Sequence, residues 1–104
     1  MITYADQETY EGLLKEGFSI VDFYTETCTP CKMFSKILEE AAGELPFLNI
    51  VKVNLTQYPK IGRKEDINAV PTIFFVKDGV ILERSEGVMG YQEVLQKVSE
   101  YYYG

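Results

Sequence analysis

The chain has 104 residues, of which 46% are hydrophobic and 25% are charged, a balance typical of globular proteins. Its 16 acidic and 10 basic residues leave a formal net charge of −6, which disfavours nucleic acid and membrane surfaces as partners. The absence of histidine excludes hydrolases that depend on a catalytic histidine. We expect residues 1–104 to form a single domain around one packed core.

The beginning of the chain lacks the basic and apolar regions of a secretory signal peptide. No apolar run approaches the roughly 20 residues that a membrane-spanning helix needs. We therefore expect a soluble, cytoplasmic protein.

Strands and helices are predicted to alternate in the first half of the chain. Residues 2–4 are a weak strand candidate, and residues 10–14 have helical spacing with Gly17 as a plausible stop. Residues 19–24 form an apolar strand run. An amphipathic helix then begins at the two cysteines and extends to about residue 45.

The second half of the chain continues this alternation. A strand is predicted at 48–55, followed by a short helix or loop at 59–66. Strands at 72–77 and 80–86 flank Asp78-Gly79, a strong hairpin signal. A last amphipathic helix covers 91–102, with Tyr102 expected on its inner face. The order predicts an α/β protein with a central mixed β-sheet flanked by helices on both faces.

Both cysteines of the chain, Cys28 and Cys31, lie in the stretch TETCTPCK. A structural zinc site needs four ligands, so this pair would need further ligands from a second subunit. A structural disulfide across so short a loop would restrict the unfolded chain little. The pattern therefore favours a redox-active pair.

The expected position of the pair at a helix start supports this interpretation. If Cys28 caps the helix, Thr29 and Pro30 occupy its first turn, where a proline loses no needed N–H, and Cys31 follows at the third helical position. The Cys28 thiolate would accept free backbone N–H groups at the positive end of the helix dipole. Its pKa is therefore expected to be lowered.

Several blocks of sequence carry a resemblance to a known family. These blocks are, in order, VDFY, TETCTPCKM, VKVN, NAVPTIFFVKDG and the glycine of SEGVMG. In this order and spacing the chain resembles the thioredoxin family almost from end to end. The resemblance implies the thioredoxin fold and thiol–disulfide oxidoreductase activity.

The resemblance also implies roles for individual residues around the cysteines. Cys28 is similar to the family's nucleophile and Cys31 to its resolving thiol, while Asp22 and Lys52 match a buried acid and a lysine near it. Asp22 and Lys52 each interrupt an apolar strand run. Because an unpaired buried charge is costly, we expect them to pair with each other, directly or through water.

A second set of residues is similar to the family's substrate-binding loops. Pro71 matches its cis-proline, which would turn the backbone of Val70 outward to pair with an extended substrate. Gly87 matches the glycine of a substrate-contacting loop that also includes Val88. Gly87 could equally be a plain turn residue.

The chain departs from the family pattern near the cysteines. Tyr24 and Thr27 stand where the family usually has tryptophan, and Thr29 replaces a glycine between the cysteines. Lys36 replaces a proline that commonly kinks the following helix, so we expect a straighter helix.

The resemblance implies an enzyme that reduces protein disulfides through a mixed disulfide. It would bind no cofactor or metal of its own, and its electrons would come from NADPH through a flavin-dependent thioredoxin reductase. We expect a monomer. Two alternatives stay open: an oxidant or isomerase whose potential is raised by Thr29, and a non-catalytic binding or adaptor module.

Overall fold

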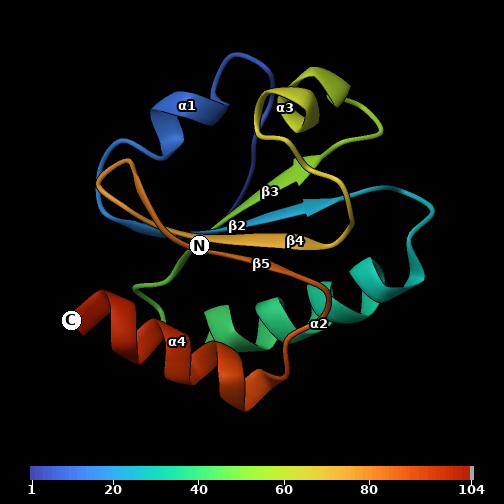
Figure 1. The fold of residues 1–104 in the computed structure, drawn as a ribbon. Helices are drawn as coiled ribbons and strands as arrows, with labels where there is room; N and C mark the ends of the chain where they lie inside the picture. Colours follow the sequence, from blue (N-terminus) through green and yellow to red (C-terminus); the bar gives the residue numbers. More distant parts are fainter. Residues whose placement is uncertain (104) are drawn as a thin grey trace.

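The computed structural model describes residues 1–103, whose five strands form one mixed sheet (Figure 1). The strands are β1 (Ile2–Tyr4), β2 (Phe18–Tyr24), β3 (Asn49–Asn54), β4 (Thr72–Lys77) and β5 (Val80–Glu86). Their spatial order is β1-β3-β2-β4-β5. The first three strands are parallel, whereas β4 is antiparallel to both β2 and β5. The predicted mixed α/β sheet is therefore confirmed.

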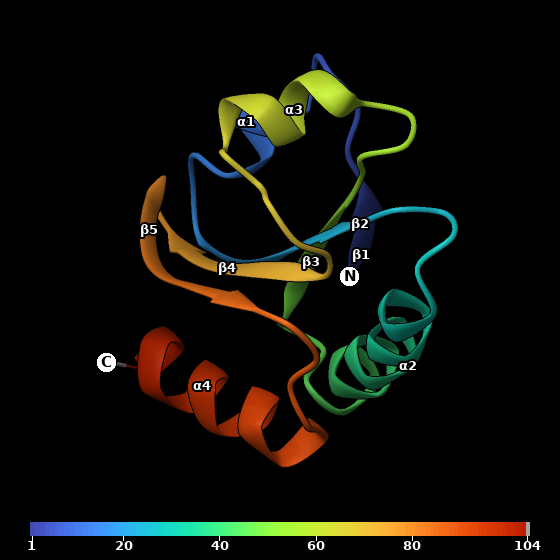
Figure 2. The same ribbon diagram turned by 45° about the vertical axis from the view of Figure 1, so that its right-hand side comes forward.

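In the described part of the chain, four helices cover the two faces of the sheet. They are α1 (Tyr10–Leu13), α2 (Thr29–Glu44), α3 (Pro59–Lys64) and α4 (Tyr91–Tyr103). Figures 1 and 2 show α2 and α4 together on one face and α1 and α3 on the other. Within residues 1–103, no helix has the length and apolar character needed to cross a bilayer.

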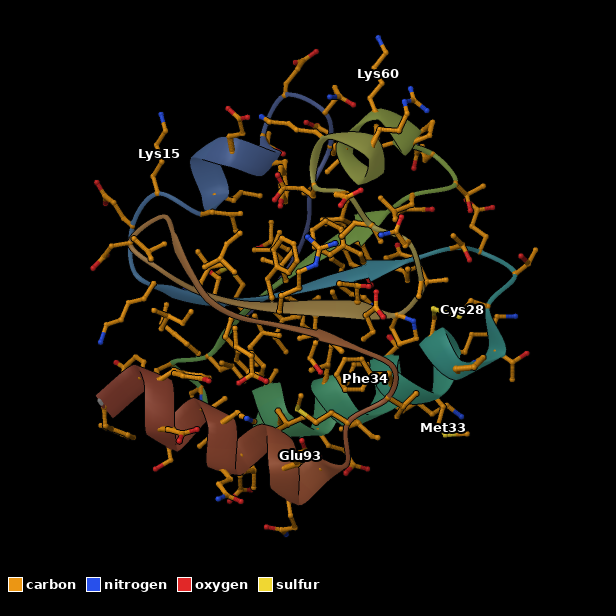
Figure 3. The ribbon with its side chains drawn as sticks, in the orientation of Figure 1. Lys15, Cys28, Met33, Phe34, Lys60 and Glu93 are labelled. Atoms are coloured by element: carbon orange, nitrogen blue, oxygen red, sulfur yellow. A yellow bond between two sulfur atoms is a disulfide. The ribbon has the colours of Figure 1, made fainter. Side chains whose placement is uncertain are left out.

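Each face of the sheet buries its own hydrophobic cluster. Ile20 and Phe75 pack with Phe34 and Leu38 of α2 on one face, whereas Phe23 and Phe74 pack with other residues on the opposite face. Side chains alternate between faces along a strand, so the apolar runs of β2 and β4 supply both clusters. Figure 3 shows Phe34 directed toward the sheet and its neighbour Met33 directed away. The parallel strands are therefore apolar without alternation because both of their faces are covered.

The turns show where local sequence did and did not predict the backbone. Asp78 and Gly79 both have positive φ, 49° and 82°, the geometry of a tight hairpin turn. Gly17 was expected to end the first helix, but α1 already ends at Leu13. Gly17, with φ of 78°, instead donates its N–H to the Asp78 carboxylate at 2.8 Å. It therefore joins the start of β2 to the hairpin.

The inner face of α4 differs in part from the prediction. The Tyr102 ring meets Phe18 of the buried cluster edge-on, with 5.9 Å between ring centroids, but Tyr101 packs against the same cluster as well, with its ring centroid 5.5 Å from that of Phe75. Tyr102 is 37% exposed and lies beside Phe47, at 4.4 Å between ring centroids. Tyr101 follows Val98 by three residues and Val94 by seven, so it shares the helix face of these two buried side chains.

Candidate active site

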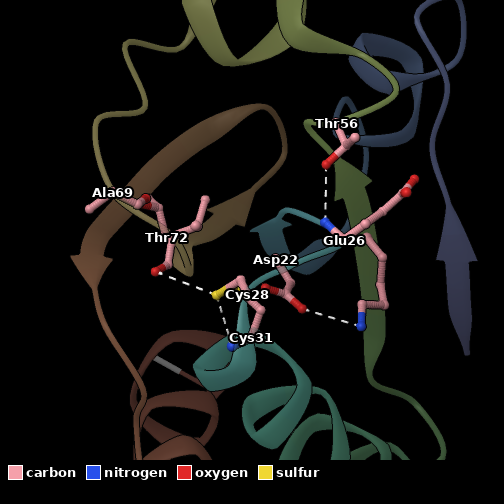
Figure 4. Close-up of a disulfide and its surroundings, with 9 residues drawn as sticks. Asp22, Glu26, Cys28, Cys31, Thr56, Ala69 and Thr72 are labelled. Atoms are coloured by element: carbon pink, nitrogen blue, oxygen red, sulfur yellow. Dashed lines mark hydrogen bonds and ion pairs between the residues drawn. A yellow bond between two sulfur atoms is a disulfide. The ribbon is translucent and has the colours of Figure 1, made fainter.

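The strand register brings three distant segments of the chain to one edge of the sheet. Phe23, near the end of β2, pairs with Thr72 at the start of the antiparallel strand β4. Thr72 in turn pairs with Glu86 at the end of β5. The cysteines after β2, the loop before β4 and the loop after β5 therefore lie near one another (Figure 4). Ligands of open α/β sheets bind at such an edge.

The cysteine pair occupies the start of α2 as predicted. Cys28 is the N-cap residue, with φ of −90° and ψ of 108°, and Pro30 lies in the first turn. The backbone N–H of Cys31 donates to Cys28 Sγ at 3.1 Å, which satisfies one of the free N–H groups of the helix start. The two cysteines are joined by a disulfide in this structure.

The two sulfurs differ in their access to solvent. Cys28 is half-buried, whereas Cys31 is 3% exposed. Cys28 Sγ faces the loop before β4, where it lies 3.8 Å from the carbonyl oxygen of Val70 (Figure 4). An incoming disulfide can therefore approach Cys28 but not Cys31.

The loop before β4 is held against the loop after β5. The Val70–Pro71 peptide bond is cis, as expected, and Gly87 donates its N–H to the carbonyl oxygen of Pro71 at 2.8 Å. Gly87 has φ of 91°, a conformation that favours glycine. Pro71 is buried, Val70 is half-buried and Val88 is 42% exposed. The backbone of Val70 and the apolar side chain of Val88 are therefore both accessible beside Cys28.

Asp22 and Lys52 are paired inside the sheet. They are register partners on β2 and β3, and Lys52 Nζ lies 3.4 Å from Asp22 Oδ2. The Asp22 side chain is 0% exposed and the Lys52 side chain is 7% exposed. The expected pairing is therefore direct, and Figure 4 shows the Asp22 carboxylate on the cysteine side of the sheet.

Burial controls the ionisation of Asp22. Removal from water raises the pKa of Asp22 from 3.8 to about 6, although the charge of Lys52 acts in the opposite direction. A carboxyl group with this pKa can both accept and release a proton near neutral pH.

The comparisons with known proteins agree with this geometry. The sequence profile of the thioredoxin family matches residues 1–100. The chain belongs to the thioredoxin family. It is 32% identical to a thioredoxin of Chlamydia trachomatis over 101 residues, which cover 97% of this chain and 99% of the relative. A thioredoxin of Staphylococcus saprophyticus is 33% identical over 95 residues, covering 85% of this chain and 88% of the relative.

Solved structures support the same fold. Thioredoxin f2 of Chlamydomonas reinhardtii superposes with a TM-score of 0.87, covering 97% of this chain and 96% of the other at 22% identity. With its family and its cysteine pair established, the chain is a thioredoxin-type disulfide oxidoreductase. A purely non-catalytic binding module is therefore not supported.

The structure shows where the residues that depart from the thioredoxin pattern lie. The Tyr24 ring lies beside the Lys52 ammonium, with 4.8 Å between Nζ and the ring centroid. Thr27 and Thr29 are exposed at the turn that carries the cysteines. Helix α2 continues without interruption through Lys36, as expected in the absence of the proline.

The structure also adds polar contacts that the sequence analysis missed. Ser35 Oγ accepts a hydrogen bond from Lys52 Nζ at 2.5 Å. Thr72 Oγ1 donates to the carbonyl oxygen of Ala69 at 2.6 Å, and Thr56 Oγ1 accepts from the backbone N–H of Glu26 at 3.0 Å. Only Ser35 had a usable signal in the sequence, because it follows Cys31 by four residues and so shares its helix face.

Among residues 1–103 there is no group of three or more histidine, cysteine, aspartate or glutamate side chains that could hold a metal ion.

Proposed function

We propose that this protein reduces disulfides of other proteins through a mixed disulfide. The Cys28 thiolate attacks one sulfur of the substrate disulfide, and the other substrate sulfur leaves as a thiolate. Cys31, after losing its proton, attacks Cys28 Sγ and releases the second substrate thiolate. The protein gains the Cys28–Cys31 disulfide and loses two electrons, which convert the substrate disulfide to two thiols once the thiolates take up protons.

The single observation that carries this order of attack is the difference in exposure between the sulfurs. Cys28 is half-buried and faces the open loop before β4, whereas Cys31 is 3% exposed. The helix start supports the Cys28 thiolate in the reduced protein, since the Cys31 N–H already points at Cys28 Sγ. Such contacts lower the pKa of a thiol and populate its attacking form.

Asp22 is the proposed acceptor of the Cys31 proton. Its carboxylate is fully buried on the cysteine side of the sheet, and burial raises the pKa of Asp22 to about 6. The acid so formed can return the proton to the departing substrate thiolate or to water. The positive charge of Lys52 stabilises the ionised Asp22 carboxylate in the protein interior.

The substrate is proposed to bind as an extended segment beside Cys28. Val70 offers its backbone at a loop edge, and Val88 offers an exposed apolar side chain across the Pro71–Gly87 contact. Protein disulfides in unfolded or loop segments suit this surface. Thr29 and Pro30 border it on the side of the helix.

The source of electrons follows from the family. Thioredoxins are generally reduced by thioredoxin reductase, and we propose a flavin-dependent enzyme using NADPH as the partner here. The chain itself then needs no bound cofactor. A reducing role also requires a compartment that keeps thiols reduced, so we propose the cytoplasm as the location.

Trapping the mixed disulfide tests the mechanism. In Cys31→Ser the second step cannot occur, so substrate proteins should accumulate on Cys28 and be released by dithiothreitol. Cys28→Ser is the matched control and should trap no substrate. Equal trapping by both variants would contradict the assigned roles. So would adducts that dithiothreitol does not release, because they are not mixed disulfides.

The reduction potential tests the direction of electron flow. The Cys28–Cys31 couple is equilibrated with graded dithiothreitol or glutathione buffers, and the thiol fraction is counted by alkylation and mass. A potential at or below the cytosolic glutathione poise, roughly −220 to −260 mV, supports the reductase. A clearly higher potential would assign the protein instead to oxidation or isomerisation. Thr29→Gly then shows whether Thr29 causes the shift.

A further inference from the structure

The ammonium group of Lys52 has three neighbours, which come from two elements. Ser35 of α2 accepts its hydrogen bond at 2.5 Å, and Asp22 of β2 lies 3.4 Å away. The face of the Tyr24 ring, also on β2, is 4.8 Å from Nζ. The lysine is 6% exposed, so these neighbours replace most of its hydration.

The short hydrogen bond of Lys52 goes to the neutral hydroxyl at 2.5 Å, whereas its contact with the Asp22 carboxylate is longer, at 3.4 Å. Neither carboxylate oxygen of Asp22 accepts a hydrogen bond from another residue within 1–103. A charge-assisted hydrogen bond from the ammonium would strongly favour ionised Asp22. The contact with Ser35 therefore directs one of the three ammonium N–H groups away from Asp22.

Helix periodicity places the hydroxyl in this position. Ser35 follows Cys31 by one helical turn, so the two side chains share a face of α2. Both line a pocket of about 140 Å³ together with Tyr24 and Lys52. The pocket is large enough for a few water molecules and connects the Cys31 side of the helix with the Lys52 ammonium.

We propose that Ser35 is a positioning residue that holds the Lys52 ammonium away from Asp22 and thereby keeps Asp22 ready to take the proton of Cys31. This inference rests on the proposed role of Asp22 in the resolving step. In that step the Cys31 S–H proton moves to Asp22, the Cys31 thiolate forms the S–S bond with Cys28, and the bond between Cys28 and the substrate breaks to release the substrate thiolate.

The other charged and titratable groups near this cluster are few. Tyr4 of β1 is the register partner of Lys52, and Glu26 and Lys32 line the same pocket from the loop and from α2. Asp22 pairs with Ile73 on the β4 side, which adds no charge. Lys52 is therefore the only cation within ion-pair distance of Asp22 among the described residues.

The test follows the titration of Asp22 directly by carboxyl ¹³C NMR in the disulfide form, in which neither cysteine titrates. In Ser35→Ala the ammonium is free to donate to Asp22, so the pKa of Asp22 should fall by about one unit. Alanine is a good helix former and Ser35 is only half-buried, so the variant should fold. Ser35→Thr, which retains a hydroxyl, should restore the wild-type titration, and Tyr24→Phe, which retains the ring, should leave it unchanged.

The resolving step supplies a second readout. Its rate is measured by stopped-flow methods against pH, and its midpoint should move to lower pH in Ser35→Ala in parallel with the NMR titration. An unchanged Asp22 titration in Ser35→Ala would overturn the inference, and so would an equal shift in Ser35→Thr. If Asp22→Asn leaves the resolving step unaltered, the role of Asp22 in the proposed function is wrong, a failure that the NMR titration distinguishes from failure of the Ser35 contact.

Discussion

Asp22→Asn should change how the stability of the oxidised protein depends on pH. Asp22 is fully buried, and burial raises the pKa of Asp22 from 3.8 to about 6. The folded protein therefore binds this proton more tightly than the unfolded chain does. The resulting stabilisation is fully present below about pH 4 and is lost as the pH rises through about 6.

The size of the effect follows from the pKa difference. A shift of this extent corresponds to about 3 kcal/mol of unfolding free energy that the wild type loses across the titration. Asparagine does not titrate, so the stability of Asp22→Asn relative to wild type should rise by about this amount between about pH 4 and about pH 8. While Lys52 keeps its charge, the cost of depriving it of its carboxylate displaces the whole difference curve by a constant amount.

The assay is urea denaturation followed by far-ultraviolet circular dichroism, since the chain contains no tryptophan. Both proteins are kept in the disulfide form so that the cysteines do not titrate. Glu40→Gln, which removes an exposed carboxylate of α2, serves as the control and should give a nearly flat difference. A flat difference for Asp22→Asn, or one that increases toward acid pH, would refute the argument from burial.

Two further pairs of variants test packing and backbone geometry. Phe34→Ala removes a fully buried ring and should cost about 3–5 kcal/mol of unfolding free energy. The neighbouring Met33 side chain is 58% exposed, so Met33→Ala should cost less than about 0.5 kcal/mol. Similar losses in the two variants would contradict the assigned helix face (Figure 3). Gly87→Ala should destabilise the folded protein by about 1 kcal/mol or more, because φ of Gly87 is +91°. Gly43 lies within α2, and no atom lies within 4 Å of a Cβ added there. Gly43→Ala should therefore stabilise the folded protein by about 0.5–1 kcal/mol. Urea denaturation at neutral pH measures both pairs, and a stabilising Gly87→Ala would show that the loop after β5 adopts another conformation.

Local sequence predicted most of the secondary structure because its signals act over short distances. The β4–β5 hairpin has the predicted bounds, since Asp78-Gly79 favours a tight turn by itself. The start of α2 was also predictable, because proline is favoured in a first turn and Cys28 can cap it. The end of α1 was not, since a short helix with little burial has no strong stop before Gly17.

The candidate site was predicted unevenly for the same reason. Cys28, Cys31 and Asp22 stood out in the sequence, because two cysteines share a motif and one acid interrupts an apolar strand. The resemblance to thioredoxins indicated Val70, Pro71 and Gly87. Nothing in their local sequence places them beside Cys28.

By itself, the sequence determined the order of strands and helices, the cysteine pair at a helix start and the need of Asp22 and Lys52 for partners. Only the tertiary structure decided that the antiparallel insertion of β4 brings Val70 within 3.8 Å of Cys28 Sγ. It also decided that Lys52 donates to Ser35 instead of Asp22. Hydrophobic periodicity acts within one element, whereas the partner of a buried ammonium depends on a register and a helix position set by packing across the whole sheet.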